Sequence, residues 1–292
     1  MSNKVLQIVT DRVLNMLKDG IVPWRRPWQN SSSPANIAGY QYRGINFFLL
    51  SMLGYETPVF LTFNQIRKAN GRIKAGEEKK HSPVFFWKVM QYNKDKLGND
   101  LDDPRSIPIA RYSQVWNISQ VEGIELPKRF QNKAERLPVL DAAEAIVTGY
   151  QNAPTLVHGG DRACYSPVLD KISMPVKESF NGAEEYYSTL FHEMAHSTGH
   201  LKRLNRKELM DSNAFGSHDY SIEELVAEMS AALMCAHAGI DNTLDNSVAY
   251  IAGWVKKLQD EPKMLMIAAA RAQKAFAHIA PQLVQESSEE SE

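Results

Sequence analysis

The sequence predicts an α+β protein of two domains, and three features of the 292-residue chain indicate this fold class. A chain of this length with 43% hydrophobic residues can build two ordinary domains, each with its own core. Residues 1–130 carry 19 Lys or Arg against 11 Asp or Glu, a net charge of +8, and the remainder carries 14 against 23, a net charge of −9. Strand and helix patterns alternate in the first part, whereas helical patterns dominate the second. We therefore assign a mixed α/β domain to residues 1–127, a polar linker to 128–136, a helix-rich domain with a small edge-stranded sheet to 137–283, and a solvated, disordered acidic tail to 284–292.

In the first domain, the elements follow from periodicity and from turn residues. Apolar residues at helical spacing predict an amphipathic helix from Val5 to Leu17, which ends before Gly20 and Pro23. A helix is predicted for residues 46–53, and Thr62 opens a further capped helix. Residues 82–90 are predicted to form a buried strand and 112–117 its return strand, with a long loop or a hairpin tip at 93–107.

In the second domain, residues 141–152 are predicted to form a helix. Residues 162–175 alternate in polarity and contain prolines, which is typical of edge strands. Two helices are then predicted near 184–200 and 221–234, and two more near 245–259 and 261–280.

The composition argues against several classes of protein. No apolar run is long enough for a transmembrane helix, and Thr10, Asp11 and Arg12 break the first apolar stretch, so we do not interpret it as a signal peptide. Cys164 and Cys235 are too few for a disulfide framework. We expect a cytoplasmic monomer with no membrane partner.

The motif His192-Glu193-x-x-His196 has the clearest chemical meaning. At 3.6 residues per turn, two histidines four positions apart lie on one helical face, where both imidazoles can bind one metal ion. A carboxylate beside them, that of Glu193, can hold a water molecule and take its proton, which is what metal-assisted peptide hydrolysis requires. The alternative is a surface helix that carries the motif by chance. We prefer the metal site because good helix formers precede the motif and no proline interrupts residues 184–200.

A tetrahedral site needs a third protein ligand, for which the sequence offers several candidates. The extended pattern His-Glu-x-x-His-x-x-Gly-x-x-His would place it at Lys202, which is unsuitable, whereas His200 extends the same helical face and stays a candidate. A helix that begins near Ser221 offers Glu224 and Glu228 one turn apart, so that one can ligate and the other can hydrogen-bond a ligand imidazole. The order of these residues resembles the ligand helix of gluzincin peptidases, which favours Glu224 as the ligand. The pattern Ser221-x-x-Glu224 also fits a capping box, in which Glu224 only caps the helix.

The basic half combines cations with aromatic side chains, the mixture that binds single-stranded nucleic acid through phosphates and stacked bases. No recognition helix or zinc-finger spacing is present, which favours single strands over duplexes. Each aromatic residue could instead lie in the core, and the lysines could simply lie on a solvated surface. The prediction therefore rests on the combination of these residues and not on any one of them. The candidate residues are Trp24, Arg25, Arg26, Trp28, Tyr42, Arg43, Lys74, Lys79, Lys80, Trp87 and Lys88.

Several motifs, in their order along the chain, resemble the ArdC antirestriction family. They include Gly20-x-x-Pro-Trp-Arg-x-Pro-Trp28, Tyr42-Arg-Gly-x-Asn46, Leu61-Thr-Phe-x-Gln65, the histidine motif through His200, Arg203-Leu-x-Arg206 and Glu223-Glu-Leu-Val-Ala-Glu228. The likeness extends to about Ala280. It implies an N-terminal single-stranded DNA-binding domain and a C-terminal zincin-like metallopeptidase domain, with His192 and His196 as ligands and Glu193 as the catalytic base. It also implies an association with mobile plasmids and a role in helping incoming DNA evade restriction.

The leading hypothesis is therefore a plasmid-type antirestriction protein that binds single-stranded DNA and carries a peptidase site with one divalent ion. Zinc is the expected ion, with manganese or another divalent ion as alternatives, and the expected partner is a protein substrate such as a component of a restriction system. The rival hypothesis is a non-proteolytic protein that coats single-stranded DNA and has a structural or vestigial metal site. A metal-dependent nuclease is disfavoured, because nucleases more often gather several carboxylates around magnesium.

Overall fold

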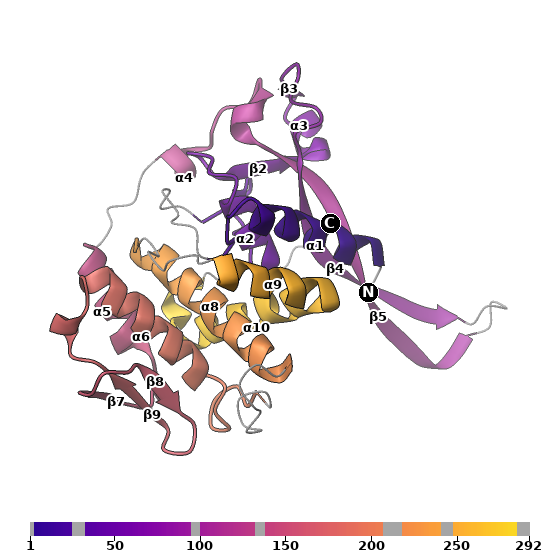
Figure 1. The fold of residues 1–292 in the computed structure, drawn as a ribbon. Coiled ribbons are helices and arrows are strands. Elements are labelled where there is room, and N and C mark those ends of the chain that lie inside the picture. The colour runs from indigo at the N-terminus through magenta and orange to yellow at the C-terminus, as the bar shows by residue number, and fades with distance from the viewer. Residues whose placement is uncertain are drawn as a thin grey trace.

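A computed structural model describes residues 3–24, 33–94, 100–131, 138–206, 218–240 and 248–284 of the chain. A mixed α/β part is followed by a helix-rich part with a small sheet, so the predicted α+β class is confirmed (Figure 1). The division of the chain at residues 128–136 stays a prediction. Helix α4 (Lys128–Gln131) begins that segment, and residues 132–137 lie outside the described ranges.

The N-terminal sheet has the strand order β1-β2-β5-β4. Its strands are β1 (Ala35–Asn36), β2 (Val59–Thr62), β4 (Ser82–Lys94) and β5 (Asp100–Asn117). β1 runs parallel to β2, and the other neighbouring strands run antiparallel. Strands β3 (Arg72–Ile73) and β6 (Val121–Glu122) form a second, two-stranded sheet.

Strands β4 and β5 are longer than the sequence indicated. Residues 93 and 94 end β4 and residues 100–107 begin β5, so the expectation of a long loop over 93–107 is wrong, and the hairpin alternative is the one observed. Each strand forms hydrogen bonds with the backbone N–H and C=O groups of the other that face it. This pairing lets a segment with aspartates and proline, which are poor strand formers, adopt extended structure.

Helices predicted in the first part are present with small shifts in their ends. They are α1 (Asn3–Lys18), α2 (Ile45–Ser51) and α3 (Phe63–Lys68). Thr62 caps α3 through a capping box with Gln65. The residue before α2 is Gly44, whose φ of 54° lies in a region that favours glycine, and its N–H donates to Gln273 Oε1 at 3.0 Å. This bond joins α2 to the C-terminal part of the chain.

The C-terminal part consists of a small sheet and five α-helices among the residues that the structure describes. The helices are α5 (Val139–Gly149), α6 (Ala183–Ser197), α8 (His218–Ala238), α9 (Val248–Asp260) and α10 (Lys263–Ile279). The sheet has the order β7-β9-β8, formed by β7 (Thr155–His158), β9 (Lys171–Met174) and β8 (Cys164–Ser166). The sequence predicts edge strands within residues 162–175, and β8 is an edge strand. For β9 the prediction is wrong, because β9 lies between β7 and β8 and pairs with both.

One large hydrophobic core runs through both parts of the chain. It joins Leu17 of α1 and Phe48 of α2 to Phe191 of α6, Leu225 of α8 and Phe276 of α10, all of them at most 2% exposed. Residues of the N-terminal sheet also take part in two smaller apolar clusters, one around Phe60 and the other around Leu61 and Trp116. The first helices are therefore packed on the C-terminal helices rather than enclosed in a separate N-terminal core.

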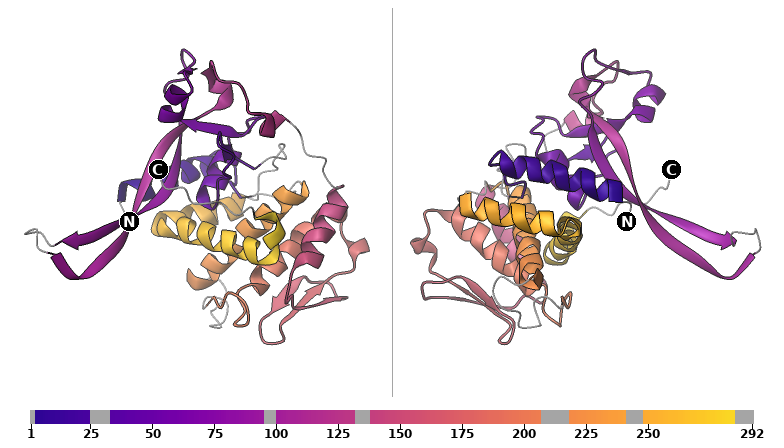
Figure 2. Two further views of the ribbon diagram at one scale, coloured as in Figure 1. Left: turned by 180° about the vertical axis from the view of Figure 1, so that it is seen from behind. Right: turned by 45° about the vertical axis from the view of Figure 1, so that its right-hand side comes forward.

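The hairpin of β4 and β5 extends away from the body of the molecule in Figure 1 and in both views of Figure 2. The helices α1 and α9 lie side by side on the opposite part of the molecule from the small β7-β9-β8 sheet (Figure 1). Every helix within the described residues is too short or too polar to cross a bilayer.

Candidate metal centre

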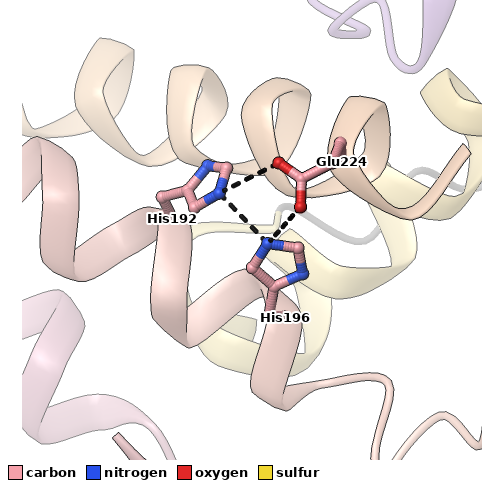
Figure 3. A group of neighbouring side chains, drawn as sticks. All are labelled: His192, His196 and Glu224. Atoms are coloured by element: carbon pink, nitrogen blue, oxygen red, sulfur yellow. Dashed lines mark hydrogen bonds and ion pairs between the residues drawn. The ribbon is translucent and has the colours of Figure 1, made fainter. Parts of the chain in front are cut away.

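Three potential metal ligands converge between helices α6 and α8 (Figure 3). His192 and His196 lie one turn apart on α6, with their Nε2 atoms 3.0 Å from each other. Glu224 reaches them from α8: its Oε2 is 3.7 Å from His192 Nε2, and its Oε1 is 3.4 Å from His196 Nε2. Among the described residues, this is the one group of at least three His, Cys, Asp or Glu residues with ligand atoms all within 4.8 Å.

These distances fit a single divalent ion. Bonds of about 2.0–2.1 Å in a tetrahedral site place ligand atoms roughly 3.4 Å apart, and the three observed distances lie on both sides of that value. Two imidazole nitrogens and one carboxylate oxygen are a donor set typical of catalytic zinc sites, which keep one position open. The side chains of His192 and Glu224 are each 25% exposed, so the site is accessible from solvent.

Glu193 follows His192 directly and is almost completely buried, at 9% exposure. Burial raises the pKa of its carboxyl group, and the charge of Glu224 raises it further. The neighbouring His196 and a hydrogen bond from the backbone N–H of Tyr165 lower the pKa and only partly offset this effect. Tyr165 belongs to β8, so the edge strand of the small sheet holds the carboxylate beside the two histidines.

Behind His196 lies a buried carboxylate that the sequence analysis did not single out. Glu223 Oε1 is 3.2 Å from His196 Nδ1, and the two side chains are 4% and 11% exposed. Hydrogen bonding of Nδ1 to a carboxylate leaves Nε2, on the opposite side of the ring, directed at the site. Adjacent positions on a helix differ by about 100°, so α8 can present both Glu223 and Glu224 toward α6. The sequence signal was the Glu-Glu pair itself, but only the helix crossing shows which carboxylate meets which atom.

Arg206 keeps Glu223 ionised. Its Nε donates to Glu223 Oε2 at 2.8 Å and its Nη2 to Oε1 at 2.6 Å, a bidentate pair. Burial would raise the pKa of Glu223, but the hydrogen bonds from Arg206 and His196 outweigh it and lower the pKa. Burial likewise disfavours charged His196, yet its contacts with Glu223 and Glu224 raise its pKa to about 10. Arg206 also donates to the carbonyl oxygen of Ala195 at 2.9 Å, which ties this network to α6.

The two alternate ligands are held elsewhere. Glu228 accepts a hydrogen bond from the indole N–H of Trp24 at 2.7 Å and another from the hydroxyl of Tyr250. His200 is 5% exposed, and its Nδ1 accepts from the backbone N–H of Lys202 at 3.2 Å. Glu228 therefore connects α8 with the N-terminal segment and α9, whereas neither residue belongs to the three-ligand group.

A second, partly buried ion pair supports β8. Arg203, 2% exposed, pairs with Asp170 in the turn between β8 and β9 and donates to the carbonyl oxygen of Ser197 at 2.7 Å. The hydroxyl of Tyr165 donates to Asp170 at 2.8 Å and accepts from Arg203 at 3.1 Å. This network fixes the strand whose backbone contacts Glu193 to the end of the motif helix.

The predicted nucleic-acid residues are spread over the N-terminal part. Trp24 is 1% exposed and packs edge-on against Trp254, so the expectation that it offers a face to a base is wrong for this structure. Tyr42 is largely buried against Phe60, which raises the pKa of its hydroxyl.

The remaining candidates divide into four groups. Lys74, Lys79 and Lys80 are exposed, and Arg43 is partly buried. Lys74 donates to the carbonyl oxygen of Ser119 at 2.7 Å, and Lys80 pairs with Glu77 at 2.6 Å. Arg25, Arg26 and Trp28 lie outside the described residues, and Trp87 and Lys88 are placed only as backbone positions on β4.

Two family models match the chain. Residues 3–116 match the N-terminal domain of anti-restriction factor ArdC, and residues 141–271 match a zincin-like metallopeptidase. The two matches therefore cover most of the two parts described above.

Proteins with similar sequences include three from bacteria. Two proteins named DNA primase TraC from Escherichia coli are each 32% identical over 94% and 91% of this chain. The chain spans only 20% and 26% of their lengths. The protein y4eC of Sinorhizobium fredii is 30% identical over 92% of this chain and 89% of its own length.

Solved structures with the same fold include the antirestriction ArdC protein from the R388 plasmid, in a metal-free and an Mn(II)-bound form. Both superpose with a TM-score of 0.74 and 31% identity over 94% of this chain. The matched region covers 96% and 97% of those chains.

Proposed function

The chain belongs to the ArdC antirestriction family, and from this premise we propose that it binds single-stranded DNA and carries a working metallopeptidase site. The observation that supports the peptidase most strongly is the convergence of His192, His196 and Glu224 beside buried Glu193. The expected partners are single-stranded DNA and a protein substrate, for which a component of a restriction system is the natural candidate.

The proposed chemistry is hydrolysis of a peptide bond. A divalent ion in such a site polarises a carbonyl oxygen and makes a water molecule more acidic. His192, His196 and Glu224 would hold the ion, and Glu193 would receive the proton of the attacking water and pass it to the leaving amine. Glu223 and Arg206 orient the His196 ring, and the Tyr165 backbone N–H orients the Glu193 carboxylate.

Zinc fits this donor set, because two imidazoles and one carboxylate are the ligands of many zinc hydrolases. The Mn(II)-bound form of the related plasmid protein supports a site that also accepts manganese. Carboxylate and imidazole ligands suit both ions, so the donor set supports a divalent ion more strongly than it supports one element.

For the basic half, the proposal rests on the charge of +8 over residues 1–130 and on the match to the ArdC N-terminal domain. Phosphates of a single strand attract such a surface, and bases stack on its aromatic side chains. We further propose that this binding serves antirestriction, in keeping with the name of the related plasmid protein.

A variant that removes only the proton acceptor tests the peptidase. Glu193→Gln should leave the metal content unchanged and abolish cleavage of fluorescein-labelled casein, with Glu184→Gln at the exposed start of α6 as the matched control. Cleavage by Glu193→Gln at the wild-type rate would refute the role of Glu193. Transfer of a plasmid into a restricting host distinguishes the peptidase hypothesis from the rival hypothesis of a DNA-coating protein. If Glu193→Gln still protects the DNA, coating rather than proteolysis provides protection.

A further inference from the structure

The β4–β5 ribbon has two faces that differ in composition. Cross-strand partners run without interruption from Ser82 opposite Val115 to Tyr92 opposite Arg105. Successive residues of a strand lie on alternate faces, and cross-strand partners share a face. The register therefore assigns every position between these pairs to one face or the other.

We define the cationic face by Phe86, Lys88, Tyr92, Arg105 and Arg111. Phe86 pairs with Arg111, Lys88 with Ile109, Met90 with Ile107, and Tyr92 with Arg105. These four pairs contain three cations, two aromatic residues and no acidic residue. The opposite face, from Phe85 paired with Tyr112 to Gln91 paired with Ser106, contains no charged residue.

The base of the ribbon shows how the faces are placed. Phe85, on the opposite face, is 6% exposed and belongs to the main core. Asn46 at the start of α2 holds the Phe85 backbone, accepting from its N–H at 2.7 Å and donating to its carbonyl oxygen at 2.6 Å. Phe86, on the cationic face, is 46% exposed, and its partner Arg111 is exposed as well. At this point the opposite face packs on the body while the cationic face is open to solvent.

The arrangement suits a flexible polyanion with accessible bases. Same-face residues on one strand are about 6.8 Å apart, so the three cations and two aromatic residues are spread over roughly 20 Å from Phe86 to Tyr92, with the apolar pair of Met90 and Ile107 among them. Cations attract phosphates, and aromatic rings stack only on bases that are not already stacked in a duplex. A single strand can also follow the twist of a two-stranded ribbon.

The lysines of the loop before β4 offer a weaker surface. Lys80 already pairs with Glu77, and Lys74 donates to the carbonyl oxygen of Ser119. Contact with phosphate would compete with these bonds. On the cationic face, by contrast, none of the four pairs from Phe86 opposite Arg111 to Tyr92 opposite Arg105 contains a carboxylate, and the first acidic position on that face of β5 is Asp103, beyond the last pair.

We propose that the cationic face of the β4–β5 ribbon is a contact surface for single-stranded DNA, with phosphates on Lys88, Arg105 and Arg111 and bases on Phe86 and Tyr92. This inference rests on the proposed function and adds the location of the contact. The ribbon extends away from the helices that carry the metal centre, so bound DNA would leave that centre open (Figures 1 and 2).

Two matched pairs of single substitutions in the full chain test the proposal. Lys88→Gln and Gln91→Glu both make the chain more negative by one charge, three positions apart on β4 but on different faces. Arg105→Gln and Ser106→Glu likewise each make the chain more negative by one charge, at adjacent positions of β5 that lie on different faces. The probe is a fluorescein-labelled 20-nucleotide single strand, titrated by anisotropy at several salt concentrations, with its duplex measured in parallel and thermal unfolding confirming that each variant is folded.

We expect Lys88→Gln and Arg105→Gln each to reduce the slope of log affinity against log salt by about 0.7, while Gln91→Glu and Ser106→Glu leave it unchanged. Phe86→Ala should weaken binding at least about five-fold. Equal effects on both faces, no effect on either, or tighter binding of the duplex would overturn the assignment of this face. The wild-type titration is a separate criterion: a chain that binds no single strand at low salt contradicts the proposed function itself.

Discussion

Replacing Arg206 with methionine removes the partner that keeps Glu223 charged inside the protein. The two side chains are 5% and 4% exposed and share two hydrogen bonds, at 2.6 and 2.8 Å. Removing one partner of a buried pair generally destabilises a protein by about 3–5 kcal/mol, because the remaining charge is left without compensation. We expect the lower end, about 3 kcal/mol, since His196 Nδ1 remains 3.2 Å from Glu223.

The assay is thermal unfolding of the metal-free protein, followed by circular dichroism. For a chain of this size, 1 kcal/mol corresponds to about 2–4 °C in Tm, so Arg206→Met should lower Tm by about 6–12 °C. Arg72→Met is the matched control, because Arg72 pairs with Glu122 at 81% exposure, and it should shift Tm by no more than about 2 °C. A shift for Arg206→Met within the range of this control would refute the reasoning.

A double variant separates stability from positioning of the metal ligand. Arg206→Met with Glu223→Leu removes both charges, so Tm should recover most of the loss. Metal affinity should not recover, because His196 then lacks the carboxylate that fixes its ring, and outer groups of this kind contribute about 10- to 100-fold to affinity. Recovery of both properties would show that Glu223 has no role in orienting His196.

Two further predictions concern other buried groups. Hydrogen bonding from Arg203 is the main cause that lowers the pKa of Asp170. The ionised carboxylate therefore stabilises the fold above its unfolded pKa of about 4, and this contribution is lost as the pH falls through the folded pKa. The Tm of Asp170→Asn should consequently fall less than that of the wild type between about pH 6 and pH 3. A wild-type-like pH dependence in this variant would contradict the assignment. Burial raises the pKa of the Cys235 thiol to about 12. Iodoacetamide at about pH 8 should therefore label partly exposed Cys164 and leave Cys235 unmodified until the protein is unfolded. Peptide mass spectrometry measures the labelling of each cysteine. Labelling of Cys235 at the rate of Cys164 in the folded protein would be the contrary result.

Local sequence patterns were sufficient for the part of the site that lies on one helix. His192 and His196 fall on one face of α6 because of helical periodicity alone, and the structure places their Nε2 atoms 3.0 Å apart. The choice among Glu224, Glu228 and His200 depended on how α6 and α8 cross, which no local pattern determines. The capping-box pattern at Ser221 does not mark a helix start, because α8 begins three residues earlier, at His218.

Contacts between distant segments account for what the sequence did not show. The partners of Arg206 and Trp24 lie 17 and 204 residues away, so neither the buried ion pair nor the core position of Trp24 could be predicted from neighbouring residues. Trp24 and Glu228 were expected at a DNA surface and at the metal site, respectively. The structure pairs them with each other, which connects the N-terminal segment to the helix that carries Glu224. The length of β5 was missed for a related reason, because its polar first residues are extended only through pairing with β4.

The most direct test of the metal centre is to measure bound zinc and manganese per chain, by elemental analysis after equilibration, in the wild type and three variants. We expect about one ion per chain in the wild type, loss of the ion in His192→Ala and Glu224→Ala, and retention in Glu228→Gln, whose carboxylate contacts Trp24 and Tyr250. A wild-type chain that binds no ion, or an ion that survives Glu224→Ala but is lost in Glu228→Gln, would contradict the three-ligand site.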